Sequence, residues 1–170
     1  MAIIIFIIFL KFALPVLIPF FPALAGWSNF VLDSVDGDLL VPLGLEDANY
    51  QLIDKIADYV TYIFIVVWAW RRVIRKEAII TFLIRTVGQF SFFLTRDEMM
   101  LFYFPNLIEP LFLIYASVEI FKGKEKTALW YRANWWWIWL IVLTYKFQDE
   151  WFTHVANVDR TEFFKGLFKR

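Results

Sequence analysis

Apolar residues form five long runs along the chain, separated by shorter polar segments. The runs cover residues 2–25, 47–74, 78–94, 99–121 and 129–147. Predominantly apolar runs of about 17–25 residues are long enough to cross the hydrocarbon core of a bilayer as helices. The pattern predicts an all-α, polytopic integral membrane protein of about five transmembrane helices, forming a single transmembrane domain over residues 1–170.

The first run, residues 2–25, carries three prolines in its second half. Proline inside a helix removes a hydrogen bond and clashes with the preceding turn, so a proline-kinked transmembrane helix is expected, bent at Pro15 and Pro19. The small residues "ALAG" at the end of the run are typical of a signal-peptide cleavage site, but no basic residues precede the run. We therefore expect this segment to remain as a membrane helix.

Polar residues predict an acidic loop over residues 27–46 and an interfacial tail over residues 148–170. The "DSVDGD" cluster in the loop lacks the EF-hand spacing, so a solvated loop is the preferred interpretation. Asp54 and Asp58 lie one helical turn apart and could bind a cation, but solvation or a pair with Arg96 is commoner. No metal site is therefore predicted.

The tail over residues 148–170 has an apolar stripe, which favours an amphipathic helix that lies on the membrane surface.

Basic residues gather in two of the connecting segments. "RRVIRKE" follows the second run and "KGKEK" follows the fourth, whereas the loop over residues 27–46 is acidic. Cytoplasmic loops of membrane proteins are enriched in Lys and Arg. Alternation of five helices then puts both basic segments and the N-terminus on the cytoplasmic side, with the C-terminus on the opposite side.

Composition narrows the range of functions. Of the 170 residues, 61% are hydrophobic and 21% aromatic, above the roughly 45–50% apolar content of soluble domains. Basic and acidic residues balance at 17 each, which removes the case for nucleic-acid binding by bulk attraction. The absence of cysteine and the single histidine, His154, exclude thiolate chemistry and the usual haem, multi-histidine metal and Ser-His-Asp sites. No catalytic constellation emerges, so the chain is predicted not to be an enzyme.

Two of the charged residues within the apolar runs lie at matching depth, Arg85 in the third run and Glu109 in the fourth. At about 1.5 Å of rise per residue, both lie roughly 17–19 Å from the turn that joins the two runs. A lone charge at that depth costs at least about 2.5 kcal/mol. An Arg85–Glu109 ion pair that faces the protein interior is therefore predicted, and Gly88 would allow the two helices to approach closely.

Neighbouring polar residues extend this pair into a predicted buried network. Gln89 lies one turn from Arg85, and Asn106 lies one turn from Glu109. Lys11 either joins the network or extends its ammonium group toward the cytoplasmic surface. Such a network either locks the helices together or forms a site for an ion, a proton or an anionic headgroup. The locking interpretation is preferred.

The prolines of the fourth run fit the same network. Pro105 and Pro110 each leave a carbonyl one turn earlier, at Leu101 and Asn106, without its helical donor. A freed carbonyl in a dry environment needs another donor, and the guanidinium group of Arg85 has several. The two prolines are therefore interpreted as helix kinks that release carbonyl groups for the charged residues.

Four tryptophans lie within five positions, at Trp135, Trp136, Trp137 and Trp139. They cover most of a helix circumference, so they cannot all face one cofactor. Interfacial anchoring explains those near the helix end. Contact with lipid, a carotenoid-like pigment, a quinone or a partner subunit stays open for the others. No cofactor is predicted, with bound lipid or pigment as the alternative.

Together these features predict a non-catalytic structural or accessory subunit of a larger membrane protein complex. Its partners would be membrane lipids and other integral membrane subunits, which suits an aromatic-rich surface. The alternative is an oligomeric transporter or channel that uses the Arg85–Glu109 network as an ion or proton pathway. An intramembrane enzyme that acts on lipid is the least favoured interpretation, because no catalytic set can be assembled from the sequence.

Overall fold

The computed structural model describes residues 1–97 and 99–152, and these residues contain eight helices and no strand. The helices are α1 (Ala2–Val16), α2 (Pro22–Leu40), α3 (Asp47–Ala69), α4 (Arg75–Thr95), α5 (Met99–Tyr103), α6 (Ile108–Lys122), α7 (Lys124–Ala133) and α8 (Trp135–Glu150). The all-α class is therefore confirmed. Most of the predicted interfacial tail, from residue 153 onward, lies outside the described residues.

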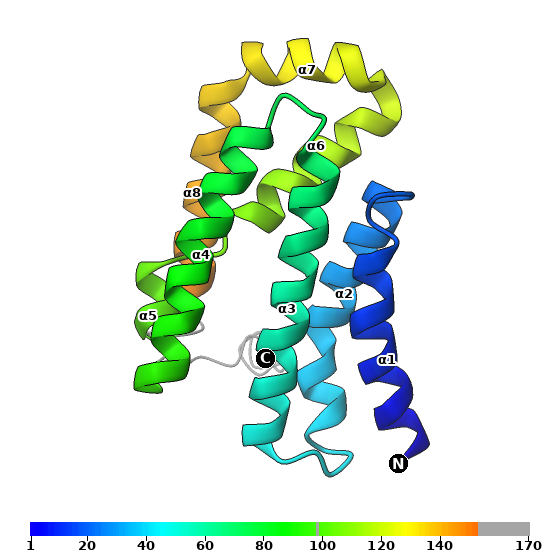
Figure 1. Cartoon of the computed structure of the whole chain (residues 1–170), viewed down its shortest axis with the longest axis vertical. Helices are drawn as coiled ribbons and strands as arrows, with labels where there is room; N and C mark the ends of the chain where they lie inside the picture. Colours follow the sequence, from blue (N-terminus) through cyan, green and yellow to red (C-terminus); the bar gives the residue numbers. More distant parts are fainter. Residues whose placement is uncertain (98, 153–170) are drawn as a thin grey trace, which may run out of the picture.

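The prediction of a single helix over residues 2–25 is wrong beyond Val16, because the chain reverses its direction there. α1 ends at Val16 with Pro15 in its last turn, and α2 begins at Pro22. Proline is favoured in the first turn of a helix, where its missing N–H has no partner to lose. The prolines, with Pro19 between them, thus end one helix and start the next instead of kinking a single helix. α1 and α2 pack side by side as an antiparallel hairpin (Figure 1).

The predicted acidic loop is also wrong over most of its length. α2 continues to Leu40, and only residues 41–46 connect it to α3. The physical reason lies in the spacing of the acidic residues: Asp33 and Asp36 are three residues apart and share one face of a helix. That face turns toward the interior, where Asp36 is completely buried.

The fourth and fifth runs are each divided into two helices. α5 is only five residues long, and the chain becomes irregular before α6 begins at Ile108. Pro105 explains this break, since it lacks an N–H group and disfavours helical geometry at the preceding residue. Pro110 lies in the first turn of α6, where it is tolerated. The fifth run divides at Asn134, which separates α7 from α8.

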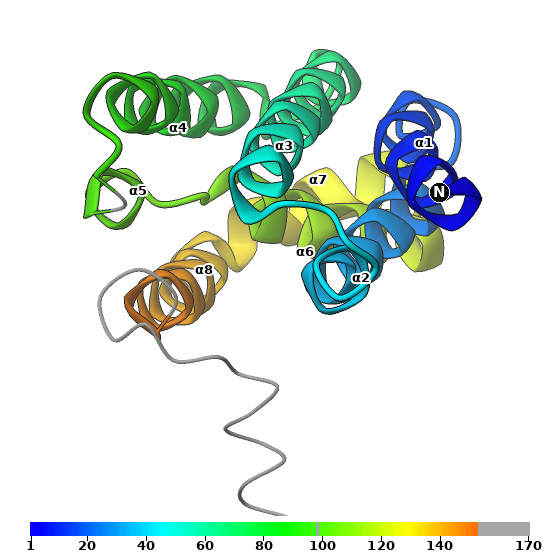
Figure 2. The ribbon, with the colours of Figure 1, turned by 90° about the horizontal axis from the view of Figure 1, so that it is seen from below.

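α6 forms the centre of the bundle. α2, α3, α4 and α8 all pack against it, and α1 lies farther out, beside α2 and α3 (Figure 2). Its residues Leu111, Phe112 and Tyr115 are buried against Trp68 of α3, whose ring meets those of Phe112 and Tyr115 edge to face. This packing supplies the apolar core against which the charged residues are held.

The two ends of the bundle differ in charge. α7 crosses one end, which we call the basic end (Figure 1). At this end Arg71 and Arg72 lie between α3 and α4, Lys122 ends α6, and Lys124 begins α7. The opposite end, called the turn end, carries residues 41–46 and the N-terminus. The five-helix alternation had grouped the N-terminus with the basic segments. That grouping is wrong, because the α1–α2 hairpin returns the chain to the turn end.

By length and hydropathy, α4 is the one described helix that could cross a membrane, and α1 is apolar but shorter. The polytopic membrane architecture is therefore not confirmed. α3 is 23 residues long but carries Asp54, Lys55 and Asp58, whereas α6 and α8 have only 15 and 16 residues.

Candidate functional site

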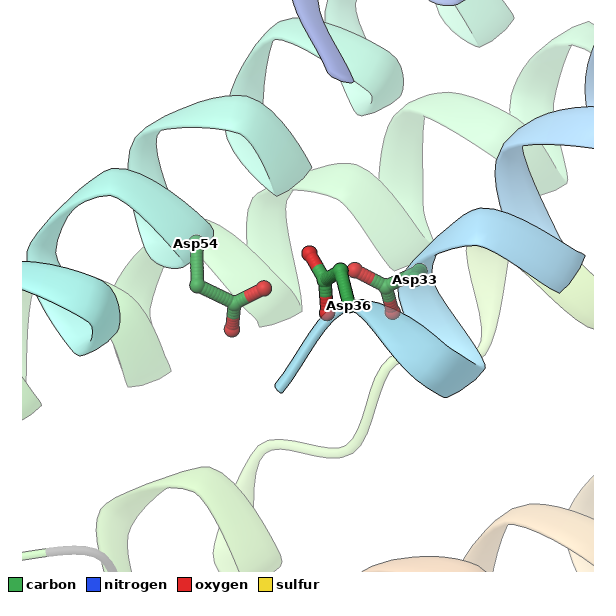
Figure 3. Close-up of side chains that lie close together, drawn as sticks. All are labelled: Asp33, Asp36 and Asp54. Carbon is green, nitrogen blue, oxygen red and sulfur yellow. The ribbon is translucent and has the colours of Figure 1, made fainter. Parts of the chain in front are cut away.

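The principal polar site is built around the ammonium group of Lys11 on α1. Its Nζ donates to Oδ1 of Asp33 at 3.1 Å, to Oδ1 of Asp54 at 2.6 Å, and to Asp36. Lys11 is only 3% exposed, and Asp36 is fully buried. Figure 3 shows the three carboxylates directed toward one another, Asp33 and Asp36 from α2 and Asp54 from α3. We call these three residues the carboxylate cluster; one oxygen of each lies within 4.8 Å of the others.

Further polar groups surround the carboxylate cluster. The Tyr50 hydroxyl donates to Oδ1 of Asp36 at 2.9 Å, and Lys55 Nζ donates to Oδ2 of Asp54 at 2.7 Å. Lys55 also lies 3.9 Å from Oδ2 of Asp58, one turn farther along α3. Lys55 therefore lies between two carboxylates of its own helix, Asp54 and Asp58.

Helical spacing and one glycine explain how the cluster assembles. The short connection at residues 41–46 makes α2 and α3 antiparallel neighbours, so Asp33 and Asp36, spaced by three on α2, meet Asp54 of α3. A Cβ atom at Gly37 would lie 2.9 Å from the Tyr50 hydroxyl oxygen. The glycine thus leaves room for Tyr50 to reach Asp36.

The predicted Arg85–Glu109 ion pair is wrong: the carboxylate beside Arg85 is that of Glu150. Nη1 of Arg85 lies 3.5 Å from Oε1 of Glu150 and donates to the carbonyls of Leu101 and Phe104 at 3.2 and 3.1 Å. The expected pair rested on counting residues along one continuous helix over residues 99–121. Because the chain leaves the helical geometry before α6 begins, the count does not give the position of Glu109. The end of α8 packs beside Arg85 instead.

The contacts between α4 and α5 agree with two sequence-based expectations. Pro105 leaves the Leu101 carbonyl without a helical donor, and Arg85 supplies one. A Cβ atom at Gly88 would lie only 2.6 Å from Phe104 Cβ, so this glycine does permit a close approach. The expected kink at Pro105 is instead a break between α5 and α6, but the carbonyl of Leu101 does accept a hydrogen bond from Arg85, as the sequence indicated.

Glu109 lies in a different part of the same network. Asn106 Nδ2 donates to Oε2 of Glu109 at 3.1 Å, and the Asn106 backbone N–H donates to Oε1 of Glu150 at 3.1 Å. Lys146 contacts Asp149 at 2.6 Å and Glu150 at 3.7 Å. Glu109 and Lys146 both line a cavity of about 240 Å³ between α2, α6 and α8. Asn106 thus connects the two glutamates, while Lys146 lies at the α8 side of the cavity.

Two further residues of the predicted network are found elsewhere. Lys11 joins the carboxylate cluster and not Arg85, because the α1–α2 hairpin packs α1 against α3. Gln89 is buried on α4, and its Nε2 donates to the Lys55 carbonyl at 3.4 Å. Gln89 therefore joins α4 to the turn of α3 that carries Asp54.

The charged residues form one layer across the bundle, near the turn end. Asp36 and Asp54 lie four and seven residues from the helix ends that meet there, or about 6–10 Å at 1.5 Å per residue. The layer has more carboxylates than cations. Its cations are Lys11, Lys55, Arg85 and Lys146, and its carboxylates are Asp33, Asp36, Asp54, Asp58, Glu109, Asp149 and Glu150.

The four tryptophans point in different directions, as their spacing requires. Trp136 and Trp137 are 79% and 67% exposed. Trp135 stacks edge to face on Trp136, with ring centroids 5.0 Å apart, and Trp139 Nε1 donates to the Tyr131 hydroxyl at 3.2 Å. The exposed pair leaves an aromatic face of α8 open to lipid or to another protein.

Sequence reasoning missed Asp33, Asp36 and Glu150 as members of the site. The sequence did carry a signal for Asp33 and Asp36. These two residues are three positions apart, and Asp54 and Asp58 are four apart, and both spacings match the helical repeat. Glu150 carried no comparable signal, because its position beside Arg85 depends on the packing of α8. Comparison of the chain with protein-family models, with curated proteins and with solved structures found no match.

Proposed function

We propose that this chain is a membrane protein that binds a divalent metal ion in the carboxylate cluster. The observation that carries the proposal is the convergence of carboxylates from two adjacent helices on a single point, now taken by the Lys11 ammonium. The cluster together with Asp58 has two more carboxyl groups than the ammonium groups of Lys11 and Lys55 can pair one to one. A divalent ion has the charge that would balance this excess.

The donor set suits a hard cation. Carboxylate oxygens are the ligands that Mg²⁺, Ca²⁺ and Mn²⁺ prefer, and the cluster offers three of them without histidine or cysteine. Four buried or half-buried carboxyl groups share only two ammonium groups, those of Lys11 and Lys55, and incompletely neutralised buried charges are unfavourable, which gives the site a driving force to take up a cation. The ion would replace the Lys11 ammonium, because both need the same point between the carboxylates.

The position of the cluster indicates a class of substrate. Mg²⁺ sites in proteins commonly combine one or two carboxylates with phosphate oxygens of the substrate, and a bound metal ion polarises such oxygens as a Lewis acid. Residues about 10 Å from the turn end lie within reach of a headgroup at the membrane surface. The geometry therefore favours metal-dependent action on a phosphate-bearing lipid, which the sequence had ranked last because no catalytic set was visible.

Polytopic insertion is part of the proposal. It is supported by large apolar side chains exposed on several helices and on the α1–α2 connection, among them Phe20, Leu24, Leu94 and Trp136, each more than 70% exposed. Hydropathy does not select α3 because that helix carries Asp54, Lys55 and Asp58, and α6 and α8 are too short to be selected. By the positive-inside rule the basic end would face the cytoplasm, and the turn end with the N-terminus would face the opposite side.

Metal binding can be tested by titrating the purified protein with Mn²⁺ in detergent and following free Mn²⁺ by electron paramagnetic resonance. Wild type is expected to bind Mn²⁺, and Asp54→Asn should lose at least tenfold in affinity. Lys11→Met should bind more tightly, because the competing ammonium group is gone. Glu125→Gln, on the exposed surface of α7, is the matched control and should leave binding unchanged. Equal affinity in Asp54→Asn and wild type would refute the proposal.

An accessory role is the second candidate, supported by the exposed Trp136 and Trp137 on α8. Gentle purification from native membrane followed by mass spectrometry would test it. Stoichiometric retention of another membrane subunit, lost on Trp136→Ala with Trp137→Ala, would favour this role. Purification of the chain alone, with metal-dependent turnover of a phospholipid, would exclude it.

A further inference from the structure

A separate pocket of about 550 Å³ lies at the basic end, away from the carboxylate cluster. Three cations line it, Arg71 and Arg72 after α3 and Lys124 at the start of α7, together with the indoles of Trp68 and Trp70. Its volume falls within the roughly 300–1,000 Å³ of small-molecule sites. The pocket therefore combines positive charge, aromatic surface and adequate room.

Arg72 is fixed in place by its neighbours and is not free to bind an anion. Its Nη2 and Nε donate to Glu119 at 2.7 and 2.9 Å, and Nη1 donates to the Trp68 carbonyl at 2.6 Å. The guanidinium group also lies 3.9 Å from the centre of the Trp68 ring. Arg72 thus forms a rigid, neutralised wall of the pocket.

The other two cations are available. Arg71 and Lys124 are exposed, and within the part of the chain that the structure describes neither forms an ion pair. Two unneutralised positive charges at the mouth of one pocket attract an anion, and a phosphate group presents several acceptor oxygens to such donors.

The remaining wall is apolar. Val66 and Val67 of α3 line the pocket on the side that leads from the basic end toward the middle of the bundle, and Pro19 of the α1–α2 connection faces them. Trp70 is 56% exposed at the mouth, a position typical of indoles at a membrane–water interface. A free phosphate would use only the cations, whereas a phospholipid would use the apolar wall as well.

We propose that this pocket binds the headgroup of an anionic phospholipid, with the phosphate between Arg71 and Lys124 and the start of an acyl chain along Val66 and Val67. The negatively charged cytoplasmic leaflet supplies such lipids to a basic surface on that side. The inference rests on the membrane placement proposed above and is independent of metal binding.

The test uses the full chain in nanodiscs of phosphatidylcholine containing phosphatidylglycerol, with retained lipids counted by native mass spectrometry. Wild type should retain phosphatidylglycerol over phosphatidylcholine. Arg71→Ala with Lys124→Ala should reduce this preference at least fivefold, whereas Arg71→Lys should keep it. The matched control is Lys126→Ala with Arg132→Ala, two exposed cations of α7 outside the pocket, and it should retain the preference.

Three results would overturn the inference. The first is no preference for phosphatidylglycerol in wild type. The second is an equal loss in both double variants, which would indicate bulk attraction. The third is binding of inorganic phosphate by the detergent-solubilised protein with the same dependence on Arg71, which would make free phosphate the ligand. Release of the chain from membranes by alkaline carbonate would instead refute the membrane placement, and loss of Mn²⁺ binding would leave lipid retention unaffected.

Discussion

Replacing Lys11 with methionine tests the central contact of the site. The substitution keeps the length of the side chain but removes the ammonium group that three carboxylates share. Removing one partner of a buried ion pair typically costs about 3–5 kcal/mol, because the other charge stays buried without compensation. Lys11 is 3% exposed and Asp36 fully buried, so the full range applies. Without metal, Lys11→Met should lose about 3–5 kcal/mol of unfolding free energy.

A divalent ion should restore much of that loss. An ion that binds only the folded state adds about 2.7 kcal/mol when its free concentration is 100 times its dissociation constant. The assay is denaturant unfolding in detergent, with EDTA or with Mn²⁺, followed by circular dichroism. Lys126→Met, on the exposed surface of α7, is the control and should change stability by less than about 0.5 kcal/mol in either condition.

The two parts of this prediction fail separately. A loss below about 1 kcal/mol in EDTA would mean that Lys11 does not neutralise the carboxylate cluster, and the reasoning from burial would be wrong. A large loss that Mn²⁺ does not restore would leave Lys11 as a structural lock and refute the metal site. Recovery by Mn²⁺ in Lys11→Met but not in Lys11→Met with Asp54→Asn would locate the ion in the cluster.

Three further predictions concern the rest of the bundle. Glu150→Gln should cost about 1–3 kcal/mol of unfolding free energy, more than Glu109→Gln does, because Glu150 is the carboxylate next to the buried guanidinium; the reverse order would reinstate the pairing expected from sequence. Gly88→Ala should cost about 1–3 kcal/mol through overpacking against the segment after α5, and unchanged stability would contradict the close approach. The chain has no cysteine, so single cysteines at Leu43 and Lys126 can report orientation: an impermeant thiol reagent should label intact cells only at Leu43, and labelling at Lys126 would reverse the orientation.

The helical class and two helices of the bundle were predictable from the sequence. Apolar periodicity placed the start of α3 at residue 47 and found α4 to within three residues at each end. It also marked Arg85 as a charge that needs a buried partner, since an isolated charge in an apolar run is unfavourable, and it left Lys11 either in the buried network or at the surface. These predictions succeed because they depend on local pattern alone.

The partners of those charges were not predictable in the same way. Lys11 meets Asp33 and Asp54, which lie 22 and 43 residues farther along the chain. Such contacts depend on whether prolines bend a helix or end it, and the local sequence permits both. Once Pro22 begins a new helix, acidic residues that resemble a solvated loop become the inner face of α2. The site therefore follows from a single choice of chain direction between α1 and α2.

The position of the charged layer argues for a binding site over a transport pathway. A transport pathway would need charged or polar groups from the turn end to the basic end. Along α3 the next charged residue after Asp58 is Arg71, just beyond the end of the helix. These two residues are 13 positions apart, or about 20 Å along the helix direction. The intervening length is core, in which Ile65 and Ala69 are fully buried. A charged layer that crosses the helices but does not run along them can hold an ion near one surface, which is the arrangement that a metal-dependent site requires.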